Sequence, residues 1–225
     1  VSLINFDAST KSQMMEVMST SPPTDAAVRK PRYHHGDLRQ ALIDASHQLL
    51  VEKGAENFSL ADACRVAGVS TAAPYKHFRD KLEILEAIVE QGFGRLAERS
   101  ISAVRSKGEG TIDGMIAMGQ AYLAFALEET AVFRLMFGHN RAIKRAAEVE
   151  KTGRACFHNV IEQVAIYCAR NNAEGDAMQI ALGLWTFVHG AACLLIDEDY
   201  ENVAPGLDVQ AMIATAATRL LPPPL

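Results

Sequence analysis

The chain has 225 residues, of which 49% are hydrophobic and 22% are charged. This length permits one or two domains with a self-sufficient core, and the composition argues against a disordered, collagen-like or rod-shaped chain. The formal net charge is −5, but residues 29–81 carry a net +3, while the segments before and after them carry −2 and −6. A basic module on an acidic body is compatible with binding a polyanion at one end.

The four cysteines lie far apart, and no CxxC pair or clustered Cys/His spacing occurs. We therefore expect no disulfide framework, no metal site and no cofactor, in a reducing compartment. The first 28 residues lack the basic and apolar regions of a secretory signal, so a cytoplasmic location is expected. The most apolar run, Ile180–Ile196, lacks flanking cations, and we interpret it as a buried helix and not a membrane span.

Residues 1–30 are rich in Ser, Thr, Pro and Met without a sustained period, which predicts a disordered arm. A short polar leader begins at Met18. Whether residues 1–17 belong to the natural protein stays open from the sequence.

From Asp37 onward the apolar period is helical, and the first predicted helix ends at Gly54. Ser59, Ser70 and Asp80 are candidate N-caps of the next three helices. These helices are predicted at Leu60–Ala67, at Thr71–Phe78 and from Lys81 onward. Further helices are expected near Ile112–Glu129, Ala131–Phe137, Arg141–Arg170, Ala173–Ile196 and Asp208–Leu221. The sequence thus predicts an all-α protein of about nine helices.

Two short helices joined by a turn at Gly68 form a candidate helix-turn-helix at residues 59–78, whose second helix would enter the major groove of DNA. Such spacing also occurs at purely structural helical corners. The three caps, the Tyr-x-x-Phe spacing of Tyr75 and Phe78 and the local positive charge together favour DNA binding.

The segment "AGVSTAAPYKHFRDKLEIL" resembles the TetR family of bacterial transcriptional regulators, and the similarity extends over residues 36–96. Further on, "FRLMF" and "WTFVHG" are similar to a ligand-domain subgroup with a Trp-His-Gly signature. The resemblance implies an N-terminal three-helix DNA-binding domain at residues 36–96. It also implies a C-terminal helical domain for effector binding and dimerisation at residues 97–225.

The resemblance implies roles for eight positions in or next to the second helix of the motif. Ser70 would cap that helix, and Thr71, Ala72 and Ala73 would face the groove and read bases. Phosphate contacts, which give salt-dependent affinity, would come from Tyr75, Lys76, His77 and Lys81. Arg32, in the basic stretch before the first helix, would add a backbone or minor-groove contact; a solvated flank is an equal alternative.

Aromatic and methionine side chains in the C-terminal half form a candidate apolar effector pocket, although helical spacing does not separate lining residues from packed ones. Trp185 and His189, four residues apart, are the best pair for a ligand contact. The candidate residues are Met118, Tyr122, Phe125, Phe133, Phe137, Phe157, Trp185 and His189.

These features predict a homodimer that binds double-stranded operator DNA, since one recognition helix buries too little surface for tight binding. The helices Ile180–Ile196 and Asp208–Leu221 would form the dimer contact. The expected function is a repressor released from a palindromic operator by an unknown small apolar effector. A constitutive repressor without an effector is one alternative, and a helical small-molecule-binding protein or enzyme without operator function is another. No spaced set of acid/base groups favours an enzyme.

Overall fold

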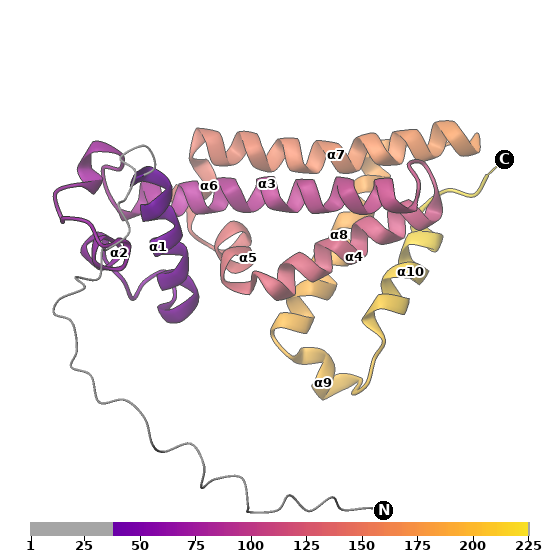
Figure 1. Cartoon of the computed structure of the whole chain (residues 1–225). Coiled ribbons are helices and arrows are strands. Elements are labelled where there is room, and N and C mark those ends of the chain that lie inside the picture. Colours follow the sequence, from indigo (N-terminus) through magenta and orange to yellow (C-terminus); the bar gives the residue numbers. More distant parts are fainter. Residues whose placement is uncertain (1–37, 225) are drawn as a thin grey trace, which may run out of the picture. The chain divides into compact units, whose positions relative to one another are not determined.

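The computed structural model describes residues 38–224, and all regular secondary structure in this part of the chain is helical (Figure 1). The predicted all-α class is confirmed. The predicted arm at residues 1–30, Met18 and Arg32 lie outside the described residues. The helices are α1 Leu38–Lys53, α2 Leu60–Ala67, the 3₁₀ helix η1 Pro74–Lys76, α3 Lys81–Lys107, α4 Ile112–Glu128, α5 Thr130–Phe137, α6 Arg141–Arg145, α7 Ala147–Asn171, α8 Ala177–Ile196, α9 Asp199–Val203 and α10 Val209–Leu220.

Local caps define both ends of α2 and the start of α3, as the sequence predicts. Ser59 Oγ accepts a hydrogen bond from the Asp62 amide at 3.2 Å, and the Asp62 carboxylate accepts one from the Ser59 amide at 2.8 Å. This reciprocal pair is a capping box. Helix α2 ends at Gly68, whose φ of +69° is left-handed and favours glycine. The Asp80 carboxylate caps α3 by accepting from the Glu83 amide at 3.0 Å.

The prediction of a Ser70-capped α-helix over Thr71–Phe78 is wrong. The chain forms only the short η1, whose N-cap is Ala73 and which has no side-chain cap. Pro74 explains the difference, because a helix starting at Thr71 would need the Pro74 amide to donate to the Ser70 carbonyl, and proline has no amide hydrogen. Proline is instead favoured at the first helical position, where it stands here.

Three further predictions in the C-terminal half need correction. The helix expected over Arg141–Arg170 is two helices, because the backbone of Ala146 is extended, with φ −61° and ψ 128°. Helix α8 begins at Ala177 and not at Ala173, since the Asp176 side chain caps it by accepting from the amides of Met178 and Gln179. Helix α9 was not predicted. The described part has ten α-helices where about nine were expected, because one expected helix is two and α9 is added, while the helix expected at Thr71–Phe78 is not an α-helix.

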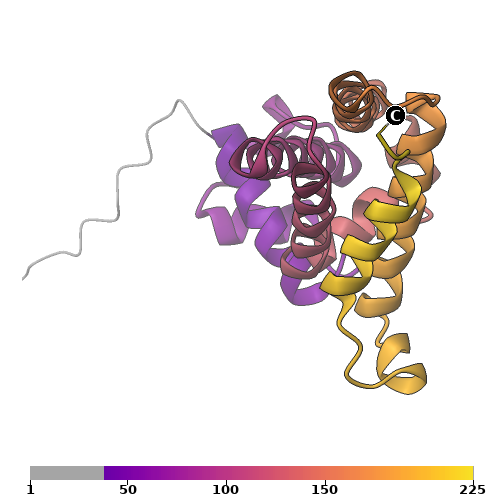
Figure 2. The same ribbon diagram turned by 90° about the vertical axis from the view of Figure 1, so that its right-hand side faces the viewer.

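The long helix α3 joins the N-terminal helices to the C-terminal bundle. Its first half packs against α1, and it also packs along α4, α5 and α7 (Figures 1 and 2). One continuous apolar core runs from Leu42 and Phe78, near the helix-turn-helix, through Ile88 to Tyr122 and Val188 in the bundle. The bundle and the helix-turn-helix are therefore connected by continuously packed side chains.

Helix α8 is not the buried helix that the sequence predicts. It packs against α4, α7 and α10, but Met178, Leu182 and Leu194 are exposed. Within residues 38–224, it is the one helix long and apolar enough to cross a membrane by length and composition. In a single chain the neighbouring helices cover only one side of it.

Candidate functional site

The helix-turn-helix presents the predicted DNA-contacting side chains on its surface. Around η1, the side chains of Thr71, Ala72, Tyr75, Lys76 and His77 are exposed. Tyr75 is 66% exposed, which is unusual for a large aromatic residue. Pro74 and Phe78 of the same turn are buried and anchor it. Ser70 is also exposed, and Ala73 is half-buried.

Lys81 differs from the exposed predicted contacts, because it is partly buried and hydrogen-bonded within the protein. Its ammonium donates hydrogen bonds to the carbonyls of Ala55 and Phe58, each at 2.8 Å, and lies 4.9 Å from the centre of the Phe58 ring. These bonds tie the loop between α1 and α2 to the start of α3. Two of the three ammonium hydrogens are therefore directed at the protein itself and not at a DNA phosphate.

A cation that the sequence reasoning did not single out lies beside this surface. The guanidinium of the exposed Arg39, on α1, lies 5.2 Å from the centre of the Phe78 ring. Of the other arginines nearby, Arg65 pairs with Asp62 at 2.8 Å and Arg79 pairs with Glu83 at 2.9 Å. The sequence signal for Arg39 was its place as a basic residue in the first turn of the first predicted helix.

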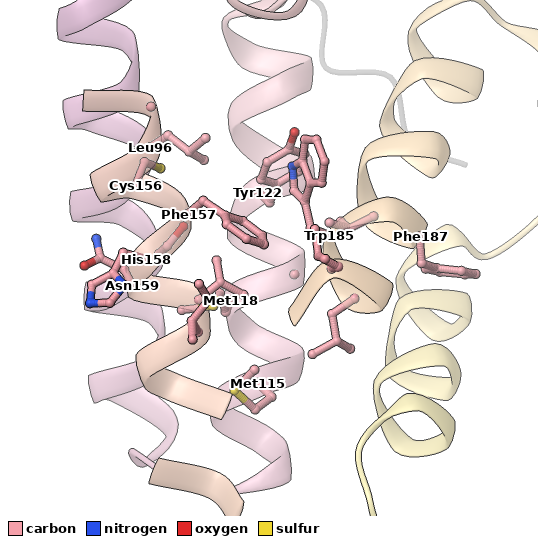
Figure 3. A pocket seen from close by; sticks show the side chains of 18 of the residues that line it. Leu96, Met115, Met118, Tyr122, Cys156, Phe157, His158, Asn159, Trp185 and Phe187 are labelled. Carbon is pink, nitrogen blue, oxygen red and sulfur yellow. The ribbon is translucent and has the colours of Figure 1, made fainter. Parts of the chain in front are cut away.

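The C-terminal bundle contains an apolar cavity of about 740 Å³ that opens to solvent, with the exposed Met178 and Leu182 among the residues that border it (Figure 3). Side chains of α3, α4, α7, α8 and α10 line it, together with Phe137 at the end of α5. A volume of this size suits a small organic ligand. Figure 3 shows Phe157 pointing from α7 toward Tyr122 and Trp185, which come from α4 and α8.

The structure brings five of the eight candidate pocket residues to the cavity wall: Met118, Tyr122, Phe137, Phe157 and Trp185. The other three are not among the lining residues. Phe125 is fully buried with Arg99 above its ring, and Phe133 is buried against Phe137 with ring centres 4.9 Å apart. His189 stacks on Trp185 with ring centres 5.3 Å apart. Lining residues that the sequence reasoning missed include Phe93, Leu96, Cys156, Leu182 and Ile213.

A short chain of polar groups lies at the aromatic side of the cavity. Tyr122 Oη and His189 Nδ1 are 2.8 Å apart, and His189 Nε2 is 3.7 Å from Cys193 Sγ. Burial raises the pKa of the Tyr122 hydroxyl far above its ordinary value. Burial, and then the charge of Lys144, lower the pKa of His189. Both groups are therefore neutral at pH 7.

Helix α5 connects the cavity to the DNA-binding end. It packs against α1 and α3 as well as α4, and Phe137 at its end lines the cavity. Just before α5, the carboxylate of Glu129 accepts hydrogen bonds from Arg95 and Arg99 of α3. The Arg95 Nε to Glu129 Oε1 distance is 3.1 Å, and the Glu129 side chain is only 13% exposed. This ion pair fixes the start of α5 against α3.

Within residues 38–224, no group of three or more His, Cys, Asp or Glu side chains is arranged to hold a metal ion.

The fold and these two sites define a class of protein: a helix-turn-helix module built onto a helical bundle with a ligand-sized cavity. Comparison with known protein families assigns the chain to the same class. Residues 42–88 match the family described as "Bacterial regulatory proteins, tetR family", and residues 115–220 match "Tetracyclin repressor-like, C-terminal domain". The chain belongs to the TetR family, as the resemblance of its sequence predicts.

Individual relatives are similar at moderate identity. A solved structure of a protein with unknown function from Rhodococcus sp. RHA1 is 32% identical, with a TM-score of 0.74 over 85% of this chain and 97% of that one. An uncharacterized HTH-type transcriptional regulator of Haemophilus influenzae (strain ATCC 51907 / DSM 11121 / KW20 / Rd) is 33% identical over 123 residues, 50% of this chain and 57% of that protein. The nucleoid occlusion factor SlmA of Haemophilus influenzae (strain PittGG) is 26% identical over 142 residues, 63% of this chain. The match spans 65% of the length of SlmA, just under two thirds.

Proposed function

We propose that this protein is a DNA-binding transcriptional regulator that acts as a homodimer. In this proposal it represses by occupying a palindromic operator, and a small apolar effector in the bundle cavity releases it. The single observation that carries the proposal is the exposed face of the helix-turn-helix, with Tyr75, Lys76 and His77 together on one short turn.

The residues of this face divide by chemistry into two groups. Thr71 and Ala72 offer a hydroxyl and methyl groups, which suit base edges and the thymine methyl in the major groove. Tyr75, Lys76 and His77 offer hydrogen-bond donors, which suit phosphate oxygens. Arg39 adds a cation from α1. We assign Lys81 a positioning role, because its ammonium holds the loop between α1 and α2.

The outer face of the C-terminal helices supports self-association. Large apolar side chains are exposed there: Leu194 of α8 at 42% and Leu220 of α10 at 40%. Met178 and Leu182 of α8, which also border the cavity, are 45% and 37% exposed. Gly190, on the same helix, has no neighbouring atom within 4 Å of where a Cβ would stand. A second copy covering this face would remove apolar surface from water and set two DNA-binding modules at a fixed spacing.

Release by an effector requires that the ligand binds better to the conformation that does not fit the operator. Helix α5 gives a physical route, since it touches the cavity at one end and packs on α1 and α3. A ligand that displaces Phe137 would move α5 and with it the DNA-binding helices.

A DNA-binding titration tests the proposal. The purified protein is titrated against DNA from upstream of its own gene and against random DNA of equal length, over a series of salt concentrations. We expect selective binding by a dimer that weakens as salt rises. Lys76→Ala should weaken binding and lower the salt slope by about 1. Lys107→Ala is the matched control, because Lys107 is exposed at the other end of α3.

Equal affinity for both DNAs at every salt concentration would contradict the proposal. In that case the cavity itself would favour a small-molecule-binding protein without operator function, the alternative that the sequence left open.

A further inference from the structure

The cavity wall is dominated by a connected cluster of aromatic rings. Phe157 and Trp185 meet edge to face with ring centres 5.8 Å apart, and Trp185 and Phe137 have centres 6.4 Å apart. Phe93 continues the cluster at 5.8 Å from Phe137, and Tyr122 lies 6.4 Å from the same ring. Aromatic rings attract one another in offset and edge-to-face arrangements beyond the area that they bury. A ligand ring that enters this cluster gains the same contacts.

The wall offers no unpaired charge to a ligand. No Lys, Asp or Glu is among the lining residues, and the two basic side chains of α7 that border the cavity, Arg154 and His158, are paired with carboxylates of the same helix. Arg154 binds Glu150 at 3.0 Å and is 74% exposed, and His158 is 3.3 Å from Glu162. Figure 3 shows His158 on the side of α7 away from Tyr122 and Trp185. A charged ligand group in the interior would lose its hydration without gaining a partner.

The polar groups that do face the cavity are neutral. They include the Tyr122 hydroxyl and the Cys156 thiol. Burial raises the pKa of the Cys156 thiol to about 11, so it carries no charge at pH 7. The Tyr122 hydroxyl is already paired with neutral His189. The polar groups are thus able to hydrogen-bond a neutral ligand but not to neutralise an ion.

From this wall we propose that the cavity binds an uncharged ligand made of linked or fused aromatic rings, and that it rejects organic ions of the same framework. The ligand lies against Trp185, Phe157 and Phe137. This inference deepens the proposed function: it names the chemical class of the effector, and it depends on that function only for the regulatory meaning of binding.

A matched pair of fluorescent probes tests the proposal on the full-length protein without DNA. N-Phenyl-1-naphthylamine is uncharged, and 1-anilinonaphthalene-8-sulfonate has the same rings with one sulfonate added. The chain has a single tryptophan, Trp185, which lines the cavity. Energy transfer from Trp185 to the probe therefore reports binding near the aromatic cluster. We expect the uncharged probe to bind at least about tenfold more tightly than the sulfonate, because the sulfonate has no partner in the wall.

Two competitors and one pair of variants locate the site and test the preference for rings. Biphenyl should displace the uncharged probe at lower concentration than 1-decanol does, and ethidium, an aromatic cation, should not displace it. Phe157→Leu should weaken binding of the uncharged probe by about threefold to tenfold, which corresponds to the loss of one aromatic contact. Phe133→Leu is the matched control: it removes a ring from the same cluster but not from the cavity wall, and should change affinity less than twofold.

The outcomes separate this inference from the proposed function. Equal or tighter binding of the sulfonate or of ethidium, or equal displacement by 1-decanol, would overturn the ligand class. No binding of any probe, or equal effects of the two Phe→Leu changes, would overturn the cavity as the site. The DNA titration of the ligand-free protein uses none of these probes, so either proposal can fail while the other stands.

Discussion

At the scale of single residues, Lys81 shows that the role expected from the family resemblance can differ from the contacts that the side chain makes in the structure. The resemblance makes it a phosphate contact, yet its ammonium donates to two carbonyls of the loop between α1 and α2. A charge-assisted bond to a carbonyl is stronger than a neutral one, and carbonyls left unpaired are costly. Lys81 therefore stabilises the arrangement in which η1 is presented.

Replacing Lys81 by methionine tests this role. The change keeps the apolar stem but removes both hydrogen bonds, and we expect it to lower the free energy of unfolding by about 1–2 kcal/mol, since the side chain is half-exposed. Urea denaturation followed by circular dichroism measures the effect. Lys76→Met, at an exposed position, should change stability by less than about 0.5 kcal/mol. If Lys81→Met leaves stability unchanged and lowers the salt slope of DNA binding by about 1, Lys81 contacts phosphate after all.

At the scale of elements, α3 and α5 approach closely because Gly92 has no side chain. A Cβ at this position would lie 2.8 Å from Val132 Cγ1 and 2.9 Å from Met136 Sδ, both on α5. Glycine inside a helix otherwise costs about 1 kcal/mol relative to alanine. The close packing of two helices, together with the ion pair of Arg95 and Glu129, offsets that cost.

Two glycines two residues apart on α3 provide a matched test of this contact. Gly92→Ala should destabilise the protein by about 1–3 kcal/mol, because the methyl group overpacks the interface with α5. Gly94→Ala should be neutral or stabilise by up to about 1 kcal/mol, since Gly94 is exposed with no atom within 4 Å of the added methyl. Thermal and urea unfolding of the two variants check the prediction. Equal stabilisation by both changes would show that α3 and α5 are not in close contact.

At the scale of the whole molecule, the apolar side chains exposed on α8 form a face that no other helix within residues 38–224 covers. Val203 and Leu207, between α8 and α10, are exposed as well. An acidic body that also carries such a face suits one self-complementary contact, placed away from the basic helix-turn-helix. Dimerisation and operator binding are then linked through the spacing of the two modules.

Leu194→Glu tests this link. The side chain is 42% exposed, so the substitution should leave the fold of one chain intact, while it buries two carboxylates in the proposed contact between copies. We expect light scattering to show a shift from dimer to monomer and palindromic DNA affinity to fall by at least about tenfold. Val51→Glu, on the exposed side of α1, is the control for oligomeric state. A dimer that survives Leu194→Glu would place the contact elsewhere on the chain.

The sequence determined the features that depend on neighbouring residues. The capping box of Ser59 and Asp62, the left-handed Gly68 and the cap at Asp80 are local, so the bounds of α2 and the start of α3 follow from a few side chains. Pro74 was also a local signal, and it explains why the second helix of the motif is a short 3₁₀ turn. The family resemblance rested on this same stretch of residues.

Only the tertiary structure decided which apolar side chains line the cavity and which pack in the core. Helical spacing places Phe125 and Tyr122 alike on the inner side of α4, yet Phe125 is packed and Tyr122 lines the cavity. Whether an inward side chain meets atoms or a void depends on distant partners, such as Phe157 and Trp185, which follow Tyr122 by 35 and 63 residues. The same holds for Lys81 and for the exposed side of α8, because carbonyl partners and covering helices come from distant parts of the fold.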